Sequence, residues 1–406
     1  MQSRRNFVRN VLIATSVPNL LSANSPILEV KNQPLPGERI NPWIELSKEA
    51  YLNNAKVIST IAGGTPVLAV LKNNAYGLGD VEVAQILDQS PHIAGIALVK
   101  DSRALAIREA GVTKPILLMG DFDEGLGKDL VKADITLAVH SYESLHKIRN
   151  LGQRRRSPIA VQLYIDTGLG RMGMPYHQAL DWAKEIATDP KLRITGTFST
   201  LTSPADFAQE QIARFNNFTA ELLSHGIEPG KRHIAPSSSM LSMKDAYLDL
   251  VRPGILLHGS FPLMDSAAAK VYNLRPTFRL KARVIRVEKL RAGDTIGFSR
   301  FYTARSDEWI ATVPIGWADG YDSRSENGAK VLVGDELYTV VNVNASHCNL
   351  LLGESKKVAV GEVATMIGPD RPEITPEGFA KLINGHNYLQ INYKESIPKY
   401  VQDSFA

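Results

Sequence analysis

Residues 66–79 read PVLAVLKNNAYGLG, and this stretch decides the fold. Its first six residues are apolar, and a helical pattern over residues 81–89 follows within a few positions. A short apolar run followed by a helical pattern is typical of a buried parallel strand and its crossover helix. The stretch therefore predicts a βα unit in which Lys72 lies at the carboxyl end of the strand.

The same unit recurs from residue 41 to about residue 265. Strand-like apolar runs occupy residues 66–71, 93–99, 115–119, 135–139, 159–165, 194–198 and 232–235. Helical patterns occupy residues 81–89, 102–110, 141–150, 178–187 and 207–225. About seven or eight such units over about 220 residues fit a (β/α)8 TIM barrel better than an open sheet. An open doubly wound sheet is the alternative.

The pattern changes after about residue 275. Residues 278–287, 308–313, 329–333, 336–343 and 357–367 are β-rich, with glycine-containing turns between them. Such segments predict a separate all-β domain at the C-terminus. We therefore expect a signal peptide over residues 1–25, a linker over 26–40, the barrel over 41–270 and the C-terminal β domain over 271–406.

Composition excludes several classes of protein. The 406-residue chain is 44% hydrophobic and 22% charged, as expected of a globular protein and not of a disordered chain or a coiled coil. Its one cysteine, Cys348, excludes a disulfide framework and a cysteine-rich metal site. Three of the four net positive charges come from Arg4, Arg5 and Arg9, so the rest of the chain has no excess basicity for nucleic acid. The basic run at residues 154–156 is interpreted as a solvated loop.

The N-terminus resembles an export signal. Residues 3–8 read SRRNFV, and a short apolar stretch follows at residues 11–17. A charged head before a short apolar segment is typical of a secretory signal and not of a membrane span. The paired Arg4 and Arg5 look like a twin-arginine signal, with cleavage expected after Ala23. The prediction is a periplasmic or secreted protein that has no membrane contact after signal removal. An uncleaved anchor or a basic tail is the alternative, and without a signal the protein would be cytoplasmic.

Lys72 is the first candidate for chemistry. In a TIM barrel the carboxyl ends of the strands carry the active site. A lysine that leaves an apolar strand is partly desolvated, which lowers its pKa and makes its amine competent to form a Schiff base. The alternative is a lysine whose ammonium group simply reaches water.

The string AVLKNNAYGLG at residues 69–79 resembles the pyridoxal-phosphate motif of the alanine racemase family, the fold-type III enzymes built from a barrel and a β domain. Further matches extend the resemblance over most of residues 41–400. It implies an isomerase that uses pyridoxal 5'-phosphate to interconvert L- and D-amino acids through an aldimine with Lys72. It also implies a small amino-acid substrate and a homodimer with shared active sites. One departure is Leu78, where the family commonly has histidine.

The resemblance also assigns individual residues. Tyr76 and the backbone of Gly254 and Ile255 would hold the phosphate, and Arg252 would face the pyridine nitrogen. Because arginine keeps its proton, the pyridine would stay neutral and would be a weaker electron sink. Arg171 would contact the phenolic oxygen and the substrate carboxylate, and no metal is expected. The implied cofactor-binding residues are Lys72, Tyr76, Arg171, Ser237, Arg252, Gly254 and Ile255, and the implied substrate-binding residues are Arg171 and Ser346.

One motif is misleading. Gly168, Gly170 and Gly173 spell G-x-G-x-x-G, the pattern of dinucleotide-binding loops. That fingerprint belongs at the opening of a helix, and here Arg171 lies inside it. We therefore interpret these glycines as part of the arginine loop and not as a phosphate cradle.

The departures concern the second catalytic base. Racemisation by two bases needs one on each face of the substrate carbon. The family's second base is a tyrosine from the partner subunit, and Phe298 occupies the matching position. In the family a histidine supports this tyrosine, and Thr200 stands at its position here. A lysine braces the family's arginine, and Tyr164 stands at that position. The candidate replacement bases are Tyr302, Tyr321 and His347, and for each the alternative is a packing role. Two further functions stay open: a one-base enzyme of the same fold (lyase, decarboxylase or epimerase), and a non-catalytic cofactor-binding protein.

Overall fold

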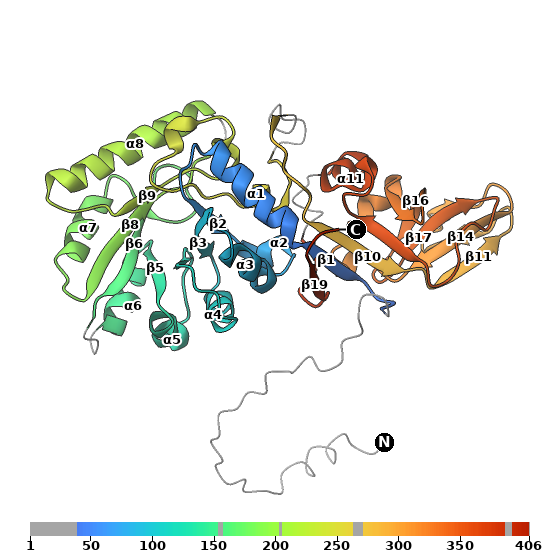
Figure 1. The fold of residues 1–406 in the computed structure, drawn as a ribbon, viewed down its shortest axis with the longest axis horizontal. Coiled ribbons are helices and arrows are strands. Elements are labelled where there is room, and N and C mark those ends of the chain that lie inside the picture. The colour runs from blue at the N-terminus through green and yellow to red at the C-terminus, as the bar shows by residue number, and fades with distance from the viewer. Residues whose placement is uncertain (1–38, 153–156, 203–204, 263–270, 386–391, 406) are drawn as a thin grey trace, which may run out of the picture. The chain divides into compact units, whose positions relative to one another are not determined.

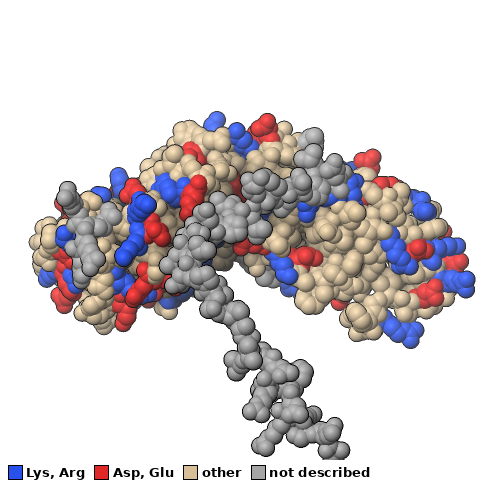
Figure 2. Space-filling view, turned by 90° about the horizontal axis from the view of Figure 1, so that it is seen from below, with Lys and Arg blue, Asp and Glu red and all other residues tan. Residues whose placement is uncertain are grey.

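The structure is a computed structural model that describes residues 39–152, 157–202, 205–262, 271–385 and 392–405. The predicted signal peptide, nearly all of the predicted linker and the basic run at 154–156 lie outside the described residues. Within the described ranges, no helix combines the length and the apolar character that a membrane crossing requires. Basic and acidic side chains are interspersed over the face shown in Figure 2.

Parallel strands with largely buried side chains form one sheet, and helices surround it (Figure 1). Each strand pairs with the next along the chain, as βα units predict. The short β7 (Met174–Pro175) pairs only with β6. The other strands are β2 (Val67–Val70), β3 (Ile93–Leu98), β4 (Ile116–Leu118), β5 (Ile135–Val139), β6 (Ile159–Asp166), β8 (Leu192–Phe198) and β9 (Lys231–His233).

Two residues close this sheet into a barrel. Val251 forms a parallel bridge with Val67 on β2, and Arg252 forms one with Pro236 just after β9. The backbone N–H of Leu68 donates to the carbonyl oxygen of Val251 at 2.9 Å. Residues 251–252 thus take the eighth strand position between β9 and β2. The predicted (β/α)8 barrel is confirmed, and the open sheet is excluded.

The surrounding helices bury one face each. In the longest of them, α8 (Ala205–Ser224), the buried positions include Ile212, Phe215 and Leu222, which recur at helical spacing. The hydroxyl of Ser47 caps the first helix by accepting from the backbone N–H of Ala50. The other helices are α1 (Lys48–Ile61), α3 (Asp80–Asp88), α4 (Asp101–Glu109), α5 (Gly127–Lys132), α6 (Tyr142–Gly152), α7 (Ala179–Ala187) and the short α9 (Ser237–Met240).

The second sheet forms the predicted C-terminal β domain. Its strands follow the order β11-β14-β17-β16-β15-β18-β10-β1-β19. Its members are β10 (Phe278–Arg283), β11 (Arg286–Leu290), β14 (Glu308–Val313), β15 (Lys330–Val333), β16 (Glu336–Val343), β17 (Cys348–Gly353), β18 (Val363–Ile367) and β19 (Lys399–Gln402). A separate hairpin of β12 (Thr295–Ile296) and β13 (Tyr302–Thr303) carries the loop of Phe298.

The first strand belongs to this second sheet. β1 (Trp43–Ser47) lies inside the range predicted for the barrel, yet it pairs with β10 and β19. All five of its residues are buried. The described chain therefore contributes a strand to the β domain before it enters the barrel at α1.

Two β-rich runs differ from the prediction. Residues 278–287 form two strands, because the chain changes its pairing partner after β10. β10 pairs with β18, whereas the backbone N–H of Ile285 already donates to the carbonyl oxygen of Thr312 in β14. In the run 357–367 only β18 is a strand. The helix α11 (Pro376–Leu382) interrupts the β domain and was not predicted.

Candidate active site

Lys72 opens a left-handed turn at the end of β2. The turn is α2 (Lys72–Tyr76), and its residues Asn73 to Tyr76 all have positive φ angles, from 48° to 59°. An L-residue in this conformation costs about 1–2 kcal/mol, so contacts from outside the turn must stabilise it. Backbone strain of this kind is typical of functional sites.

The turn is held by its own polar groups and by the C-terminal segment. The backbone N–H of Gly77 donates to the carbonyl oxygen of Asn73 at 3.0 Å, and the Asn74 side chain accepts from the N–H of Asp80 at 3.1 Å. A Cβ atom on Gly77 would lie 2.3 Å from the backbone nitrogen of Tyr393. The backbone near Tyr393 therefore packs directly on the turn that carries Lys72.

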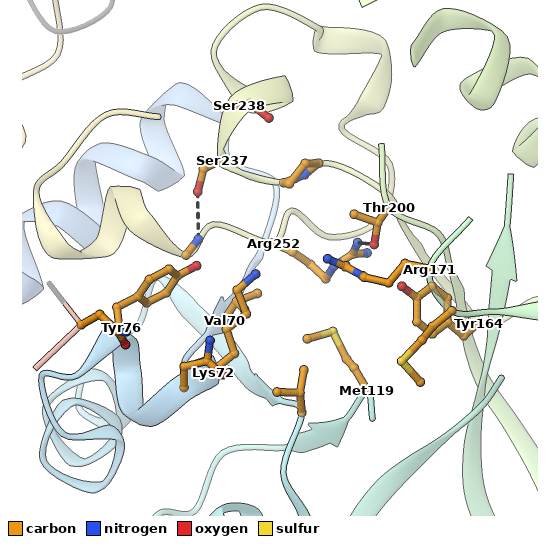
Figure 3. Close-up of a pocket in the computed structure, with 16 residues that line it drawn as sticks. Val70, Lys72, Tyr76, Met119, Tyr164, Arg171, Thr200, Ser237, Ser238 and Arg252 are labelled. Carbon is orange, nitrogen blue, oxygen red and sulfur yellow. Dashed lines mark hydrogen bonds between the residues drawn. The ribbon is translucent and has the colours of Figure 1, made fainter. Parts of the chain in front are cut away.

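A cavity of about 630 Å³ lies where the barrel strands end. Figure 3 shows Lys72, Tyr76, Ser237, Arg252 and Arg171 around the same space. These residues come from strand ends far apart in the sequence, as a barrel active site requires. The lining is Val70, Lys72, Asn73, Tyr76, Val99, Met119, Tyr164, Arg171, Met172, Thr200, Pro236, Ser237, Ser238, Arg252, Gly254 and Asn392.

The Lys72 amine is shifted toward its neutral form. Its side chain is half-buried, and its Nζ lies 5.9 Å from the centre of the Tyr76 ring. Burial lowers the pKa of Lys72, and the positive charges of Arg171 and Arg252 lower it further. A neutral amine is the form that attacks an aldehyde or removes a proton.

Arg252 is fixed by contacts within the chain. Its Nη1 donates to Nδ1 of His233 at 2.7 Å and to the His233 carbonyl at 2.6 Å. Its Nη2 donates to the Ser199 carbonyl and to Oγ1 of Thr200. Each terminal nitrogen thus has two acceptors, which leaves Nε–H as the donor for a bound group. Burial lowers the pKa of Arg252 to about 10, which keeps it charged at neutral pH.

His233 fixes the orientation of Arg252 as a neutral ring. Burial, and next the charge of Arg252, lower the pKa of His233 well below its usual value. Its Nδ1 accepts from Arg252, so its Nε2 carries the proton and donates to Oε1 of Gln162 at 2.9 Å. This residue was not predicted as part of the site, although it lies on β9 in a segment that resembles the family.

The phosphate side of the cavity is a close-fitting cradle. Oγ of Ser237 accepts from the backbone N–H of Gly254 at 2.9 Å, the dashed line in Figure 3. A Cβ atom on Gly254 would lie 2.1 Å from the hydroxyl oxygen of Tyr76, so only glycine fits there. The predicted cofactor residue Ile255 is buried and is not among the described lining residues of this cavity.

Arg171 lies in a loop that Asp166 holds. The Asp166 carboxylate accepts from the backbone N–H groups of Gly168 and Gly170 at 2.9 and 3.2 Å. The loop joins β6 to β7, and the next helix, α7, begins only at Ala179. No helix opens at these glycines, which supports the interpretation that they are not a dinucleotide-binding motif.

Two of the departures from the family pattern have structural roles. The Tyr164 ring stacks on Phe198 with centroids 4.3 Å apart, and Phe198 stacks on His233 at 5.1 Å. An aromatic stack therefore stands where the family has a lysine brace. Thr200 accepts from Arg252 and lines the cavity.

Of the two predicted substrate-binding residues, Arg171 lines this cavity and Ser346 does not, and none of the candidate replacement bases is among its described lining residues. Ser346 and His347 line another cavity of about 360 Å³ in the β domain, and Phe298 is 100% exposed. The hydroxyl of Tyr302 donates to Glu308 at 2.5 Å. The remaining candidate, Tyr321, is fully buried in the β domain core.

Sequence reasoning missed several lining residues. Val99 and Met119 end the predicted runs 93–99 and 115–119, so the rule that strand ends carry the site would have found them. Met172 follows Arg171 directly. Asn392 had no signal, because the chain returns to the barrel only in the tertiary structure.

The described lining also fits pyridoxal phosphate. It contains the cations Lys72, Arg171 and Arg252 and no aspartate or glutamate. Such a site favours a ligand that carries a phosphate, a phenolate and an aldehyde. Among the described residues, no group of three histidine, cysteine, aspartate or glutamate side chains is placed to hold a metal ion.

Two family models match the chain. The model for the N-terminal domain of alanine racemase matches residues 46–262, and the model for the C-terminal domain matches residues 277–399. The alanine racemase of Carboxydothermus hydrogenoformans is 29% identical over 365 residues, which cover 88% of this chain and 98% of the relative. That of Desulforamulus reducens is 31% identical over 353 residues, which cover 85% of this chain and 94% of the relative.

Solved structures agree. The alanine racemase of Streptomyces coelicolor A3(2) has a TM-score of 0.82 and 27% identity, and the match covers 89% of this chain and 98% of that chain. The alanine racemase of E. faecalis has a TM-score of 0.79 and 27% identity, with the same shares covered.

Proposed function

This chain belongs to the alanine racemase family, and we propose that Lys72, Arg171 and Arg252 carry its reaction. It is a pyridoxal-phosphate-dependent amino-acid racemase, an isomerase. The names of its relatives make alanine the first substrate to test. The observation that supports the residue assignment most strongly is the meeting of these three cations in one cavity without a described carboxylate.

The bound cofactor supplies a carbonyl for the substrate amine and a conjugated ring that stabilises negative charge at the substrate Cα. The chain's residues do the rest. Tyr76, Ser237 and Gly254 would bind the phosphate, and Nε–H of Arg252 would be the donor available to the ring nitrogen. A guanidinium does not release its proton, so Arg252 keeps the charge on the ring low. This restraint favours return of the proton to Cα over side reactions.

Lys72 moves the Cα proton on one face of the substrate. Its lowered pKa gives a larger share of neutral amine at physiological pH, which is the form that accepts a proton. Arg171 binds the substrate carboxylate, and its exposed position at the cavity mouth lets it meet the incoming amino acid. The apolar side chains of Met119 and Val99 line the cavity and limit water there.

The experiment incubates the full chain with pyridoxal phosphate and L-alanine in deuterium oxide. We expect D-alanine with deuterium at Cα, measured by chiral chromatography and mass spectrometry. Lys72→Ala should lower the rate at least about a thousandfold, since it removes a proton carrier and the covalent anchor. The control Lys56→Ala alters an exposed lysine on α1 and should leave the rate unchanged. The proposal is contradicted if the wild-type protein loaded with pyridoxal phosphate forms no D-alanine, or if the product has a changed carbon skeleton.

We propose His347 as the base for the opposite face. Tyr302 is bonded to Glu308, and burial with this bond raises the pKa of Tyr302 to about 12. Burial raises the pKa of Tyr321 well above its usual value. His347 is only half-buried, and its Nδ1 lies 2.8 Å from Oγ of Ser346, so its Nε2 remains for proton transfer.

Because His347 does not line the cavity of its own subunit, it would act on the cavity of a partner in a homodimer. A mixture of the Lys72→Ala and His347→Phe proteins tests this. Random exchange should restore about one quarter of the wild-type rate, since half of the pairs are hybrids with one intact site each. In the control mixture of Lys72→Ala with Tyr302→Phe, the rate should be about half the wild-type rate and should not change on exchange, since Tyr302→Phe subunits keep both Lys72 and His347. No recovery after verified subunit exchange contradicts a shared site.

We also propose that the N-terminal segment exports the folded, loaded enzyme. Arg4→Lys with Arg5→Lys keeps the charge and removes the arginine pair. Cell fractionation should then find the protein in the cytoplasm, whereas Arg9→Lys should not change its location. Equal amounts outside the cytoplasm for both proteins contradict a twin-arginine route.

A further inference from the structure

His258 lies behind the phosphate cradle, fully buried between two tyrosine rings. Its ring meets Tyr51 edge to face at 5.7 Å and 86°, and it meets Tyr76 at 5.1 Å and 64°. It ends the short turn η4 (Ile255–His258), which begins directly after Gly254. A single side chain thus connects helix α1, the turn that carries Lys72 and the backbone of the cradle.

The polar atoms of His258 argue for a role beyond packing. Its Nδ1 lies 3.0 Å from the hydroxyl of Tyr51. Its Nε2 is buried, and no described residue offers a hydrogen-bond partner. Burial lowers the pKa of His258 to about 3, so the ring is neutral. An unsatisfied buried nitrogen costs about 1–3 kcal/mol, and an apolar ring would fill the space without this cost.

Tyr76 is the group that needs support. It has a positive φ angle of 59°, and its hydroxyl lies against Gly254, where a Cβ atom would be 2.1 Å away. Its ring must therefore be held within a few tenths of an ångström for the hydroxyl to meet the phosphate and not the glycine. The His258 ring packs against the Tyr76 ring with the centroids 5.1 Å apart.

We propose that His258, oriented by Tyr51, is a positioning residue that aligns Tyr76 and the η4 backbone for the phosphate of the cofactor. The imidazole is fixed at Nδ1 by a side chain from α1, and its ring packs against the Tyr76 ring at an interplanar angle of 64°. This inference rests on the proposed assignment of Tyr76, Ser237 and Gly254 to the phosphate. It predicts that His258 matters for phosphate binding and not for the aldehyde reaction at Lys72.

The experiment compares two aldehydes, pyridoxal phosphate and unphosphorylated pyridoxal. Each is titrated into the full chain, and imine formation at Lys72 is followed by absorbance. His258→Phe should weaken the binding of pyridoxal phosphate about three- to tenfold, the effect of about one net hydrogen bond, and should leave the binding of pyridoxal unchanged. Tyr51→Phe should shift the same ratio of affinities in the same direction by a smaller factor.

Tyr338→Phe is the matched control. It removes a tyrosine hydroxyl that donates to Glu336 in the β domain, and both affinities should stay at the wild-type values. Two outcomes overturn the inference while the proposed function stands. One is an equal loss of affinity for both aldehydes, and the other is an unchanged affinity for pyridoxal phosphate in both Tyr51→Phe and a folded His258→Phe protein. A wild-type chain that forms no imine with either aldehyde overturns both.

Discussion

At the scale of single residues, the cavity places three positive charges close together before any ligand binds. Lys72 is one of the three, and burial lowers its pKa first, with the positive charges of Arg171 and Arg252 lowering it further. Of the three, only Arg252 donates hydrogen bonds to described residues from both of its terminal nitrogens. The site thus favours anionic ligands and keeps one amine ready to react.

Lys72→Met should therefore stabilise the unliganded chain. Because the folded-state pKa of Lys72 is lowered, the unfolded chain binds more protons in the interval below the usual lysine pKa, and stability rises with pH there. At neutral pH the variant should gain about 1 kcal/mol, as is common when a functional residue is replaced. Urea unfolding at several pH values measures this.

The difference in the free energy of unfolding between Lys72→Met and wild type should shrink as the pH rises toward the usual lysine pKa. The wild-type amine then loses its proton in both the folded and the unfolded state. Lys56→Met, an exposed position, should show no such pH dependence. A gap that stays constant up to high pH contradicts a charge effect.

At the scale of elements, two turns position the reactive groups, and each relies on a contact with another part of the chain. The left-handed turn α2 is packed by the backbone near Tyr393. The loop after β6 is held by Asp166, and Arg214 adds a bond from its Nη1 to the Thr167 carbonyl at 2.9 Å. Both turns thus combine strained or irregular backbone with specific external partners.

Gly77→Ala should destabilise the chain by about 3 kcal/mol or more. The added Cβ would meet the Tyr393 nitrogen at 2.3 Å, and the φ of 90° adds a left-handed penalty. Gly64→Ala is the matched control, since its φ is 88° with nothing within 4 Å. It should cost only about 1–2 kcal/mol. Equal losses in urea unfolding would show that the C-terminal backbone does not support the turn.

Asp166→Ala should impair substrate binding with little change in stability. Two backbone N–H groups would lose their acceptor, and the Arg171 loop would move relative to the cavity. We expect kcat/KM to fall about ten- to a hundredfold, mainly through KM, because displaced binding groups lose orientation. Asp206→Ala, which removes one acceptor at the start of α8, should leave both constants unchanged.

At the scale of the whole molecule, the β domain carries large apolar side chains that the single chain leaves exposed. Phe298, Phe301 and Trp317 are 100%, 61% and 57% exposed. Exposed aromatic groups of this size are typical of interfaces. They support the proposed homodimer, in which this surface would meet the barrel of the partner.

Phe298→Asp should therefore weaken the dimer. Burying a carboxylate in place of a ring costs several kcal/mol at an interface, so the variant should sediment as a monomer at concentrations where wild type is a dimer. Val360→Asp is the control, because Val360 is 62% exposed elsewhere in the β domain. A dimer of unchanged affinity in Phe298→Asp contradicts the proposed interface.

The amino-acid sequence by itself determined the barrel, the following β domain and the identity of the lysine. Apolar runs such as 66–71 and 159–165 are strands because both faces of a parallel barrel strand are buried, and this burial leaves a local pattern. Lys72 could be recognised in part in the same way, because it directly follows a predicted strand, whereas Arg171 and Arg252 were recognised only through the resemblance to the family.

Only the tertiary structure decided the long-range pairings. It placed β1 in the second sheet, closed the barrel through Val251, brought Asn392 to the cavity and packed His258 against Tyr76. It also left Tyr321 buried within the β domain core. None of these facts has a local signature, because each depends on which distant segments exclude water together, and a chain's hydrophobic pattern specifies burial but not the partner.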